Sequence, residues 1–373
     1  MKKVLVLEYI DLRFGKANGI HSMIQSMMTD RNTVWAIAGV FSDSNTVDRR
    51  AVTHFADNIY EFTVGRLSRN SMDIRLIPNS LKYCFFLLLN RSKLAGDIVH
   101  AHRIEIGLAS LLLLRKTPLV QFVHNSRYDL VDQSSSSSFW RYFPKLHSKI
   151  SNFVYKRAHS IVVFNANEYE IACQKSKRVL LGKTWYDEKI FHRNSEVSRS
   201  GSIKLVWIGR FEQEKNPIFA LHVLGSLVSK GFKVHLSLIG YGSLEQKITE
   251  CIQELKLEDN ITVHGYLPHS SVADILRQSD VLIQSSKYEG SPTVVIESLA
   301  CGVPVVSADS GDPDRLVVNF VNGFRTEELV VSEFVDYIPM CMNLEATDIV
   351  KSVDNRSKSK SLPQLIAFST HIT

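Results

Sequence analysis

The chain has 373 residues, of which 45% are hydrophobic and 22% charged, values that exclude a disordered or fibrous protein. This length predicts two domains of under about 200 residues, each able to bury its own core. Charge is shared unevenly, because residues 1–183 carry 26 Lys and Arg against 14 Asp and Glu, whereas the remainder carries 18 against 24. A basic first half predicts an anionic partner for that half, and we do not expect nucleic acid to be that partner.

The cysteines and apolar runs indicate the compartment. None of the five cysteines forms a C-x-x-C pair, so we expect unpaired thiols in a reducing compartment and no zinc site. The N-terminal run is interrupted by Glu8 and Asp11, which favours a buried strand over a signal peptide. The longest other apolar runs, 84–89 and 111–114, are too short to span a bilayer. We therefore expect a cytoplasmic protein, with peripheral attachment to the inner face of the plasma membrane as the alternative.

The first half alternates strands and helices. The apolar run 4–7 predicts a strand, and the loop 11–19, with Gly15 and Gly19, leads into a helix from Ile20. This order can place an anion at the helix N-terminus, although a simple connecting turn has the same pattern. Further strands are expected at 34–40, 59–62, 97–101, 118–124, 160–164 and 179–181, with helices at 77–94 and 107–114. His102 and His124 follow two of these strands, as in a doubly wound parallel sheet whose ligands bind beyond the carboxyl ends of its strands.

Two segments of the first half have unusual composition. Five serines at 134–138 predict a loop, which either covers a cleft near His124 or has no function. Residues 139–156 predict a basic, aromatic-rich amphipathic helix with Pro144 in its first turn or kinking it. Such a helix suits an anionic membrane surface, and a solvated basic face is the alternative.

The second half repeats the strand–helix pattern. Strands are expected at 204–208, 234–239, 261–264, 281–284 and 303–308, and helices at 217–230, 244–255 and 270–278. The polar stretch 188–202 is expected to link the domains. The predicted organisation is two doubly wound Rossmann-like domains facing across a cleft, over residues 1–185 and 200–340, followed by a tail at 341–373.

Cations and carboxylates at the strand ends of the second half indicate a nucleotide site. Arg210 and Lys215 follow a strand directly and match a diphosphate, since Arg offers forked donors and Lys a point charge. Glu289 and Glu297 flank a helix start whose unpaired N–H groups can hold phosphate or sugar oxygens. Each pair on its own is also compatible with ordinary surface charges.

These motifs resemble the donor-site signature of retaining GT-B glycosyltransferases of the group 1 type. The likeness rests on E-x7-E at Glu289 and Glu297 and on G-x-P-V-V at 302–306, and it covers roughly residues 1–330. It implies a GT-B fold and transfer of a sugar, with retention and without a metal, from a nucleotide-diphosphate sugar to a polysaccharide, lipopolysaccharide or lipid-linked acceptor.

The resemblance implies roles for individual residues. His124 and Glu289 would be catalytic, with Glu289 also holding the sugar, Arg210 and Lys215 would bind the diphosphate, and Glu297 the ribose. The remaining donor-binding positions that it implies are Gly19, Gly240, Gly290, Ser291, Pro292 and Thr293.

The chain departs from the family pattern in three places. The loop 311–314 reads Gly-Asp-Pro-Asp rather than carrying a double glycine and a glutamate, the first loop has Gly-Ile-His, and the tail is short and polar. The tail is expected either to return to the first domain in abbreviated form or to be disordered. Two other functions stay open: a sugar-nucleotide epimerase of the same fold and a non-catalytic sugar-nucleotide binder.

Overall fold

The computed structural model describes residues 1–10, 19–41, 52–67, 78–124, 140, 142–194, 201–289, 291–312 and 315–372. The predicted glycine loop (11–18), the serine run, Gly290 and residues 195–200 of the expected linker lie outside these ranges. The chain forms two compact units: unit 1 comprises residues 1–182 and 362–373, and unit 2 comprises residues 183–361.

Unit 1 is built on an eight-stranded sheet in the order β3-β4-β2-β1-β5-β6-β7-β8. All neighbouring strands are parallel except β3, which pairs with β4 in antiparallel orientation. The central strands are continuous apolar runs that are buried on both faces, as parallel sheets covered by helices require. The strands are β1 (Lys2–Leu7), β2 (Thr33–Phe41), β3 (Val52–Ala56), β4 (Ile59–Arg66), β5 (Ile98–Ala101), β6 (Leu119–Val123), β7 (Ser160–Val163) and β8 (Val179–Leu181).

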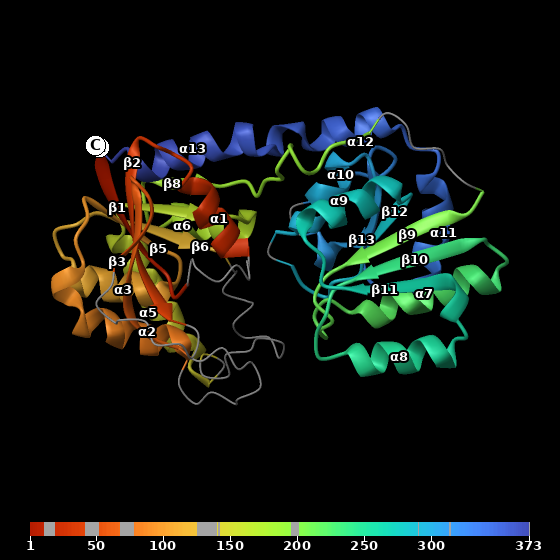
Figure 1. The fold of residues 1–373 in the computed structure, drawn as a ribbon, viewed down its shortest axis with the longest axis horizontal. Coiled ribbons are helices and arrows are strands. Elements are labelled where there is room, and N and C mark those ends of the chain that lie inside the picture. Colours follow the sequence, from red (N-terminus) through yellow and green to blue (C-terminus); the bar gives the residue numbers. More distant parts are fainter. Residues whose placement is uncertain are drawn as a thin grey trace. The chain divides into compact units, whose positions relative to one another are not determined.

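Helices cover both faces of this sheet. Residues of α2 (Asn79–Leu89), α3 (Ile104–Leu113) and α5 (Pro144–Arg157) share one hydrophobic core with the sheet. Helices α1 (Gly19–Met27) and α13 (Lys358–Thr370) lie on the other side (Figure 1). The helix α6 (Ala166–Cys173) connects β7 to β8.

The helix expected over 77–94 is shorter in the structure. α2 ends at Leu89, and a separate 3-10 turn follows at Arg91–Lys93. The break falls at Asn90, whose side-chain amide donates to the carbonyl oxygens of Phe86 and Val64, each at 2.9 Å. The helix ends here because the Asn90 side chain bonds carbonyl oxygens in the place of a further helical turn.

The tail is helical rather than unstructured. Although its composition is polar, it forms two helices, α12 (Ala346–Val353) and α13. They form because the buried residues Ile349, Val353, Leu362 and Leu365 recur at helical spacing. Residues 362–373 are part of unit 1, where the carbonyl oxygen of Ser369 lies 3.0 Å from Nε2 of the buried His100.

Unit 2 has a six-stranded, fully parallel sheet in the order β11-β10-β9-β12-β13-β14. Its strands are β9 (Ile203–Ile208), β10 (Val234–Ile239), β11 (Ile261–Gly265), β12 (Val281–Gln284), β13 (Val305–Ala308) and β14 (Gly323–Thr326). Its longer helices, besides α12, are α7 (Pro217–Ser229), α8 (Glu245–Glu254), α9 (His269–Gln278), α10 (Thr293–Ala300) and α11 (Val331–Cys341). The predicted α/β class with doubly wound sheets is therefore confirmed.

Each sheet has one place where the strand order reverses. In unit 2 the chain runs outward from β9 through β10 and β11, then returns to place β12 on the other side of β9. In unit 1 the corresponding reversal lies between β1 and β5. Open α/β sheets bind ligands at these points, beyond the carboxyl ends of the strands.

Gly302 ends α10 and explains the glycine of the G-x-P-V-V motif. Its φ of +77° lies in the left-handed region. Its N–H donates to the carbonyl of Leu299 at 2.9 Å, and the N–H of Val303 donates to that of Ser298 at 3.0 Å. A glycine in this conformation closes a helix without the strain that a side chain would bring.

Candidate active site

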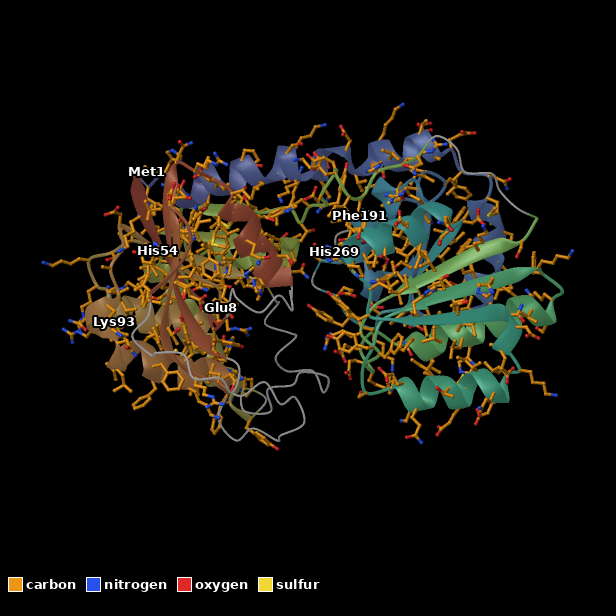
Figure 2. The ribbon with its side chains drawn as sticks, viewed as in Figure 1. Met1, Glu8, His54, Lys93, Phe191 and His269 are labelled. Atoms are coloured by element: carbon orange, nitrogen blue, oxygen red, sulfur yellow. The ribbon has the colours of Figure 1, made fainter. Side chains whose placement is uncertain are left out.

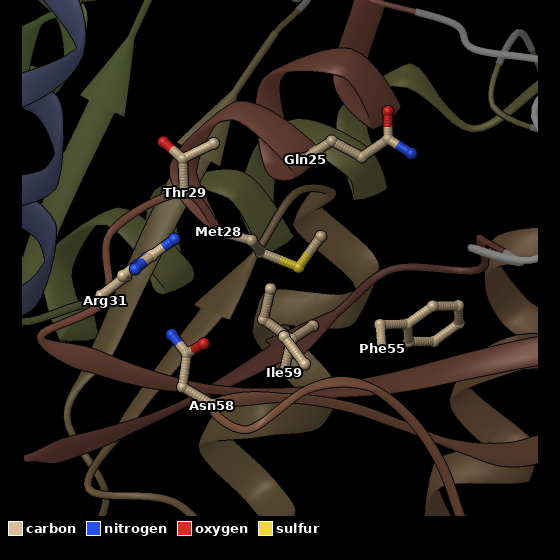
Figure 3. A pocket seen from close by; sticks show the side chains of 8 residues that line it. Gln25, Met28, Thr29, Arg31, Phe55, Asn58 and Ile59 are labelled. Atoms are coloured by element: carbon tan, nitrogen blue, oxygen red, sulfur yellow. The ribbon is translucent and has the colours of Figure 1, made fainter.

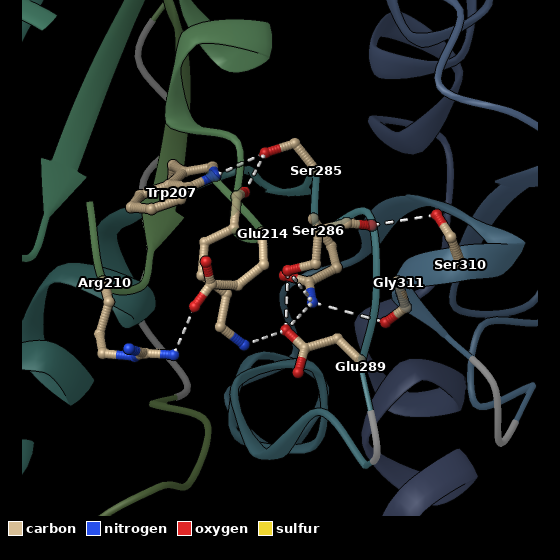
Figure 4. A network of polar contacts seen from close by, with 10 residues as sticks. Trp207, Arg210, Glu214, Ser285, Ser286, Glu289, Ser310 and Gly311 are labelled. Carbon is tan, nitrogen blue, oxygen red and sulfur yellow. Dashed lines mark hydrogen bonds and ion pairs between the residues drawn. The ribbon is translucent and has the colours of Figure 1, made fainter. Parts of the chain in front are cut away.

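Lys215 and Glu289 form an ion pair at the strand-order reversal of unit 2. Lys215 lies in the loop after β9 and Glu289 in the loop after β12, and Nζ and Oε1 are 2.5 Å apart. The same Oε1 accepts hydrogen bonds from Ser286 Oγ at 2.7 Å and from Gln284 Nε2 at 3.2 Å (Figure 4). The structure thus brings together two residues predicted from the sequence, 74 positions apart.

The two loops are also tied together below this ion pair. Trp207 Nε1 donates to Ser285 Oγ at 2.8 Å, and this hydroxyl lies 2.9 Å from the carbonyl oxygen of Asn216. The backbone N–H of Lys287 donates to the carbonyl of Glu214 at 2.8 Å. These bonds fix the spacing of the loops, so the position of the ammonium is set by the fold.

Arg210 lies in the same loop as Lys215 but is more exposed. Its Nη2 bonds Glu214 Oε1 at 2.7 Å. Both cations therefore have a carboxylate partner. An ammonium carries three donors and a guanidinium five, so each keeps donors for a further oxygen ligand.

The start of α10 supplies backbone donors beside Glu289. Pro292 is its N-cap and Thr293 its first residue. The first N–H groups of any helix have no partner within that helix. Ser291 Oγ lies 2.7 Å from Thr184 Oγ1. The predicted position Gly290 lies outside the described residues.

Glu297 lies in the second turn of α10. Its side chain is half-buried, and among the hydrogen bonds within the described residues none is donated to its carboxyl. Burial raises the pKa of Glu297 to about 8. A carboxyl that is partly desolvated and receives no hydrogen bond holds its proton to higher pH, because loss of contact with water disfavours its charged form.

Gly240 follows β10 and is enclosed by backbone. Its N–H donates to the carbonyl of Gly265 at 2.9 Å. An added Cβ would lie 1.8 Å from the carbonyl oxygen of Gly209. The lack of a side chain here is required for packing, and the predicted donor contact stays a prediction.

In the loop after β13, where the sequence departs from the family pattern, Asp312 forms hydrogen bonds to backbone groups of the same segment. The buried Asp312 accepts from the N–H groups of Leu316 at 2.9 Å and Val317 at 2.7 Å. Residues 313–314 lie outside the described ranges. Gly311 faces the Glu289 network, since Gln284 Nε2 lies 3.4 Å from its carbonyl oxygen (Figure 4).

The sequence prediction omitted the polar residues that support Glu289. Gln284, Ser285 and Ser286 follow the apolar part of β12 and bond to Glu289 or to the adjoining loop. The change from apolar to polar residues at the end of this strand was the available signal.

In unit 1, His124 follows β6 and is bonded to His102, which follows β5. His124 Nε2 lies 3.0 Å from His102 Nδ1, and the ring planes differ by 15°. Burial, assisted by the nearby Arg103, lowers the pKa of His124 to about 3, and burial also lowers that of His102. Both imidazoles are therefore neutral at neutral pH.

The surroundings of His102 decide which nitrogen of this neutral pair carries the shared proton. His102 Nε2 is buried and has no hydrogen-bond partner among the described residues. A buried N–H without a partner is rarer than an unsatisfied acceptor. We therefore assign the proton to His102 Nδ1, which donates to His124 Nε2, so that His124 carries its own proton on Nδ1.

A buried carboxylate and an arginine lie at the strand-order reversal of unit 1 and were not predicted as site residues. Glu8 directly follows β1, and Arg103 directly precedes α3. Arg103 Nε donates to Glu8 Oε1 at 3.0 Å (Glu8 is labelled in Figure 2). Burial raises the pKa of Glu8 even though Arg103 opposes this. The predicted Gly19 begins α1, and the loop before it lies outside the described residues.

A hollow of about 460 Å³ lies elsewhere in unit 1. Residues of α1, of the turn directly after it and of the β3–β4 hairpin line it, among them Gln25, Met28, Phe55 and Ile59 (Figure 3). Strand β4 begins at Ile59, so the hollow is at the amino end of the sheet. It contains none of the predicted site residues.

The described residues contain neither a candidate metal site nor a candidate membrane span. No group of three or more His, Cys, Asp or Glu side chains that could hold a metal ion occurs there. Within the same ranges, no helix is both long and apolar enough to cross a membrane.

Comparison with known sequences identifies relatives. An uncharacterized glycosyltransferase of Methanocaldococcus jannaschii is 23% identical over 273 residues, 69% of this chain and 64% of that protein. The amylovoran biosynthesis glycosyltransferase AmsK of Erwinia amylovora is 26% identical over 132 residues, 34% of this chain and 32% of that protein. The chain thus spans less than two thirds of the length of these relatives.

Comparison with solved structures identifies the fold. Sucrose-phosphate synthase of Thermosynechococcus elongatus superposes with a TM-score of 0.76 at 15% identity, covering 98% of this chain and 97% of that one. HepE of Anabaena, crystallised in complex with UDP and glucose, gives 0.68 at 16% identity and 98% coverage of both chains. These similarities establish the GT-B fold.

A family model matches part of the second half of the chain. Residues 188–357, which contain the Lys215–Glu289 pair and α10, match the model described as glycosyl transferases group 1. This match covers somewhat less than half of the chain, so it relates residues 188–357, and not the whole chain, to the glycosyl transferases of group 1.

Proposed function

We propose that the protein is a retaining, metal-independent glycosyltransferase that moves a sugar from a nucleotide-diphosphate sugar to a glycan or lipid-linked acceptor in surface polysaccharide or lipopolysaccharide synthesis. The Lys215–Glu289 ion pair at the β9–β12 reversal carries this proposal. Similar proteins support it, since the structure of one was solved in complex with UDP and glucose and another is a glycosyltransferase of amylovoran biosynthesis.

The donor diphosphate would bind at Lys215 and Arg210. The nucleoside diphosphate is the leaving group of such a transfer, so negative charge builds on it as the glycosidic bond breaks. Fixed cations held by the loops after β9 and β12 stabilise that charge without reorganising. The Glu289 network keeps the ammonium in place, and its remaining donors face the ligand.

Glu297 and Glu289 would bind hydroxyl groups of the donor. A carboxylate at Glu297 accepts two hydrogen bonds from a ribose diol, which supplies the donors that this side chain lacks among the described residues. Such bonds favour the charged form, so donor binding would lower the pKa of Glu297. The Glu289 oxygen that does not bond Lys215 would accept from a sugar hydroxyl, and the N–H groups at the start of α10 would hold sugar or phosphate oxygens.

In unit 1 the role of His124 follows from its protonation. A neutral imidazole with its proton on Nδ1 donates a hydrogen bond to a sugar oxygen and carries no charge that would repel a developing cation. We assign the acceptor to this unit, whose sequence is the basic half of the chain.

The test is a thermal-shift screen with nucleotide sugars, followed by transfer assays with the donor that stabilises the protein. A stabilising donor whose labelled sugar moves to a glycan or lipid-linked acceptor with retained anomeric configuration is the expected result. Conversion of the sugar without acceptor would show an epimerase, and donor binding with no reaction toward any acceptor would show a binding protein. Transfer with inverted configuration would overturn the retaining assignment.

A further inference from the structure

The outer face of three neighbouring helices in unit 1 is both cationic and apolar. Helix α3 packs between α2 and α5, and their inner sides share the core with the sheet. Segments 79–93, 104–116 and 142–157, which contain these helices, carry nine Lys and Arg but a single carboxylate, Glu105. Glu105 bonds Ser80 and the indole N–H of Trp140, at 3.0 and 2.6 Å. The nine cations are exposed, and within the described residues none of them forms an ion pair; they are Lys82, Arg91, Lys93, Arg115, Lys116, Lys145, Lys149, Lys156 and Arg157.

Large apolar side chains are exposed among these cations. On α2, Phe85 is 57% and Leu89 65% exposed, and just before α5 Tyr142 is 76% exposed. Others on the same three segments are Leu88, Leu112, Phe143, Leu146 and Phe153. We call these side chains, with the nine cations, the outer face. Large apolar side chains gathered on one exposed face mark an interaction site on a soluble protein.

Within each helix the cations and apolar groups share one stripe. On α2, Lys82, Phe85 and Leu89 follow at spacings of three and four, opposite the buried Tyr83 and Leu87. On α5, Leu146, Lys149, Phe153 and Lys156 follow in the same way, opposite the buried Val154. The guanidinium carbon of Arg157 lies 5.7 Å from the centre of the Phe153 ring.

We propose that the outer face docks on an anionic lipid bilayer. Phenylalanine, tyrosine and leucine side chains enter the boundary between headgroups and acyl chains, while lysines beside them reach lipid phosphates. Six of the nine cations are lysines, a residue type that is depleted in protein–protein interfaces but binds anionic membrane surfaces. Exposed leucines do not suit nucleic acid, whose bases stack on aromatic rings.

This docking extends the proposed function, since a lipid-linked acceptor would be met at that bilayer. The outer face also lies close to the carboxyl edge of the unit 1 sheet, where we propose that the acceptor binds. Helix α3 begins directly after Arg103, and Glu105 in its first turn joins Ser80 at the start of α2 to Trp140 before α5. The beginnings of these helices thus lie by the carboxyl edge of the sheet.

The test is flotation of the full chain with vesicles of phosphatidylcholine alone or mixed with phosphatidylglycerol. We expect binding to the mixed vesicles that falls as salt rises, and little binding to phosphatidylcholine alone. Lys145→Glu with Lys149→Glu, and separately Phe85→Ser with Leu89→Ser, should each weaken binding about tenfold or more. The matched controls are Lys247→Glu on α8 and Leu181→Ser on β8, both exposed positions that should leave binding unchanged.

Three outcomes would overturn the proposal: equal binding to both vesicle types, binding that neither double variant weakens, and self-association through this face without vesicle binding. Circular dichroism and thermal unfolding show whether each variant is folded. Nucleotide-sugar binding by the same variants separates the two proposals. Vesicle binding without any donor binding would refute the sugar transfer alone, whereas donor binding without vesicle binding would refute the docking alone.

Discussion

His102 Nδ1 lies 3.0 Å from Nε2 of His124, between two rings that are nearly parallel, and in the tautomer assigned above His102 is the donor. His102 is buried and also stacks on Phe122, with ring centroids 4.5 Å apart. It therefore holds His124 in one orientation and one tautomer while being too deeply buried to touch a ligand itself. His102 is a positioning residue for His124.

Replacing His102 by Phe should keep the stack and remove the hydrogen bond. We expect about fivefold slower sugar transfer, the value of one ordinary hydrogen bond, with donor affinity little changed. The ¹⁵N shifts of His124 should show a proton on Nδ1 in the parent protein and a mixture of tautomers in H102F. Unchanged ¹⁵N shifts in a folded H102F would contradict the assignment.

Lys215→Ala should weaken donor binding about tenfold or more, because it removes a charge-assisted contact to the diphosphate. Lys230→Ala is the matched control, since Lys230 also pairs with a carboxylate of unit 2, Asp336 at 3.3 Å, but both side chains are exposed. Calorimetric titration with the nucleotide sugar and with the nucleoside diphosphate measures both variants. Equal affinity of K215A and K230A for the diphosphate would show that Lys215 does not bind it.

The pKa of Glu297 gives a pH dependence with a definite sign. The folded protein keeps this proton up to about pH 8, whereas the pKa of an exposed glutamate is 4.5. The folded state therefore binds more protons in this interval, so this residue reduces stability progressively as the pH rises from 4.5 toward 8. Glu297→Gln should unfold at a higher temperature than the parent at pH 8, with the difference shrinking toward pH 4.5.

The pH dependence of donor affinity tests whether the Glu297 carboxylate binds the donor. Binding through a Glu297 carboxylate should strengthen as the pH rises toward 8, and E297Q should bind more weakly and lose this pH dependence. A parent protein whose affinity is flat between pH 6 and 8 would show that the carboxylate does not bind the donor.

Metal independence is tested by removing metal ions. Because we propose that Lys215 and Arg210 neutralise the diphosphate, transfer should proceed in the presence of a chelator at its rate without one. Loss of activity that only added Mg²⁺ or Mn²⁺ restores would refute this assignment. Assays of donor binding under both conditions show whether the metal acts on binding or on transfer.

Gly302→Ala should destabilise the protein by about 1 kcal/mol, since its φ of +77° is unfavourable for a residue with a side chain. Gly225→Ala is the matched control: it lies inside α7, and an added Cβ would meet its nearest neighbour at 3.7 Å, an ordinary contact. We expect G225A to stabilise the protein by about 0.5–1 kcal/mol. Denaturant unfolding measures both changes, and equal effects of the two substitutions would contradict the account of the α10 terminus.

Strands buried in the centre of a sheet could be predicted from the sequence, because burial on both faces demands continuous apolar runs. β10 and β12 have the bounds expected from their residues. β3 was missed since it is an edge strand with mostly exposed residues, and α6 because its residues alternate in polarity without a strong helical stripe. The polar residues at 354–360 concealed the helical spacing of the tail.

The candidate site was predictable only in part. Polar residues at the carboxyl ends of parallel strands indicated Lys215, Glu289 and His124. Their pairing with Gln284, Ser286 and His102 was not predictable, because these contacts depend on how neighbouring strands are ordered. The raised pKa of Glu297 likewise follows from burial, which its position in the sequence does not reveal.

Unit 1 is made of two segments from opposite ends of the chain, and this affects the order in which the units fold during translation. Residues 362–372 complete this unit, and the backbone of this segment bonds side chains such as Arg178, whose Nη2 donates to the carbonyl of His371 at 2.7 Å. The ribosome makes these residues after all of unit 2. Unit 2 can thus reach its final structure while unit 1, although begun first, still lacks one of its helices. The order in which the two units are completed is the reverse of the order in which their synthesis starts.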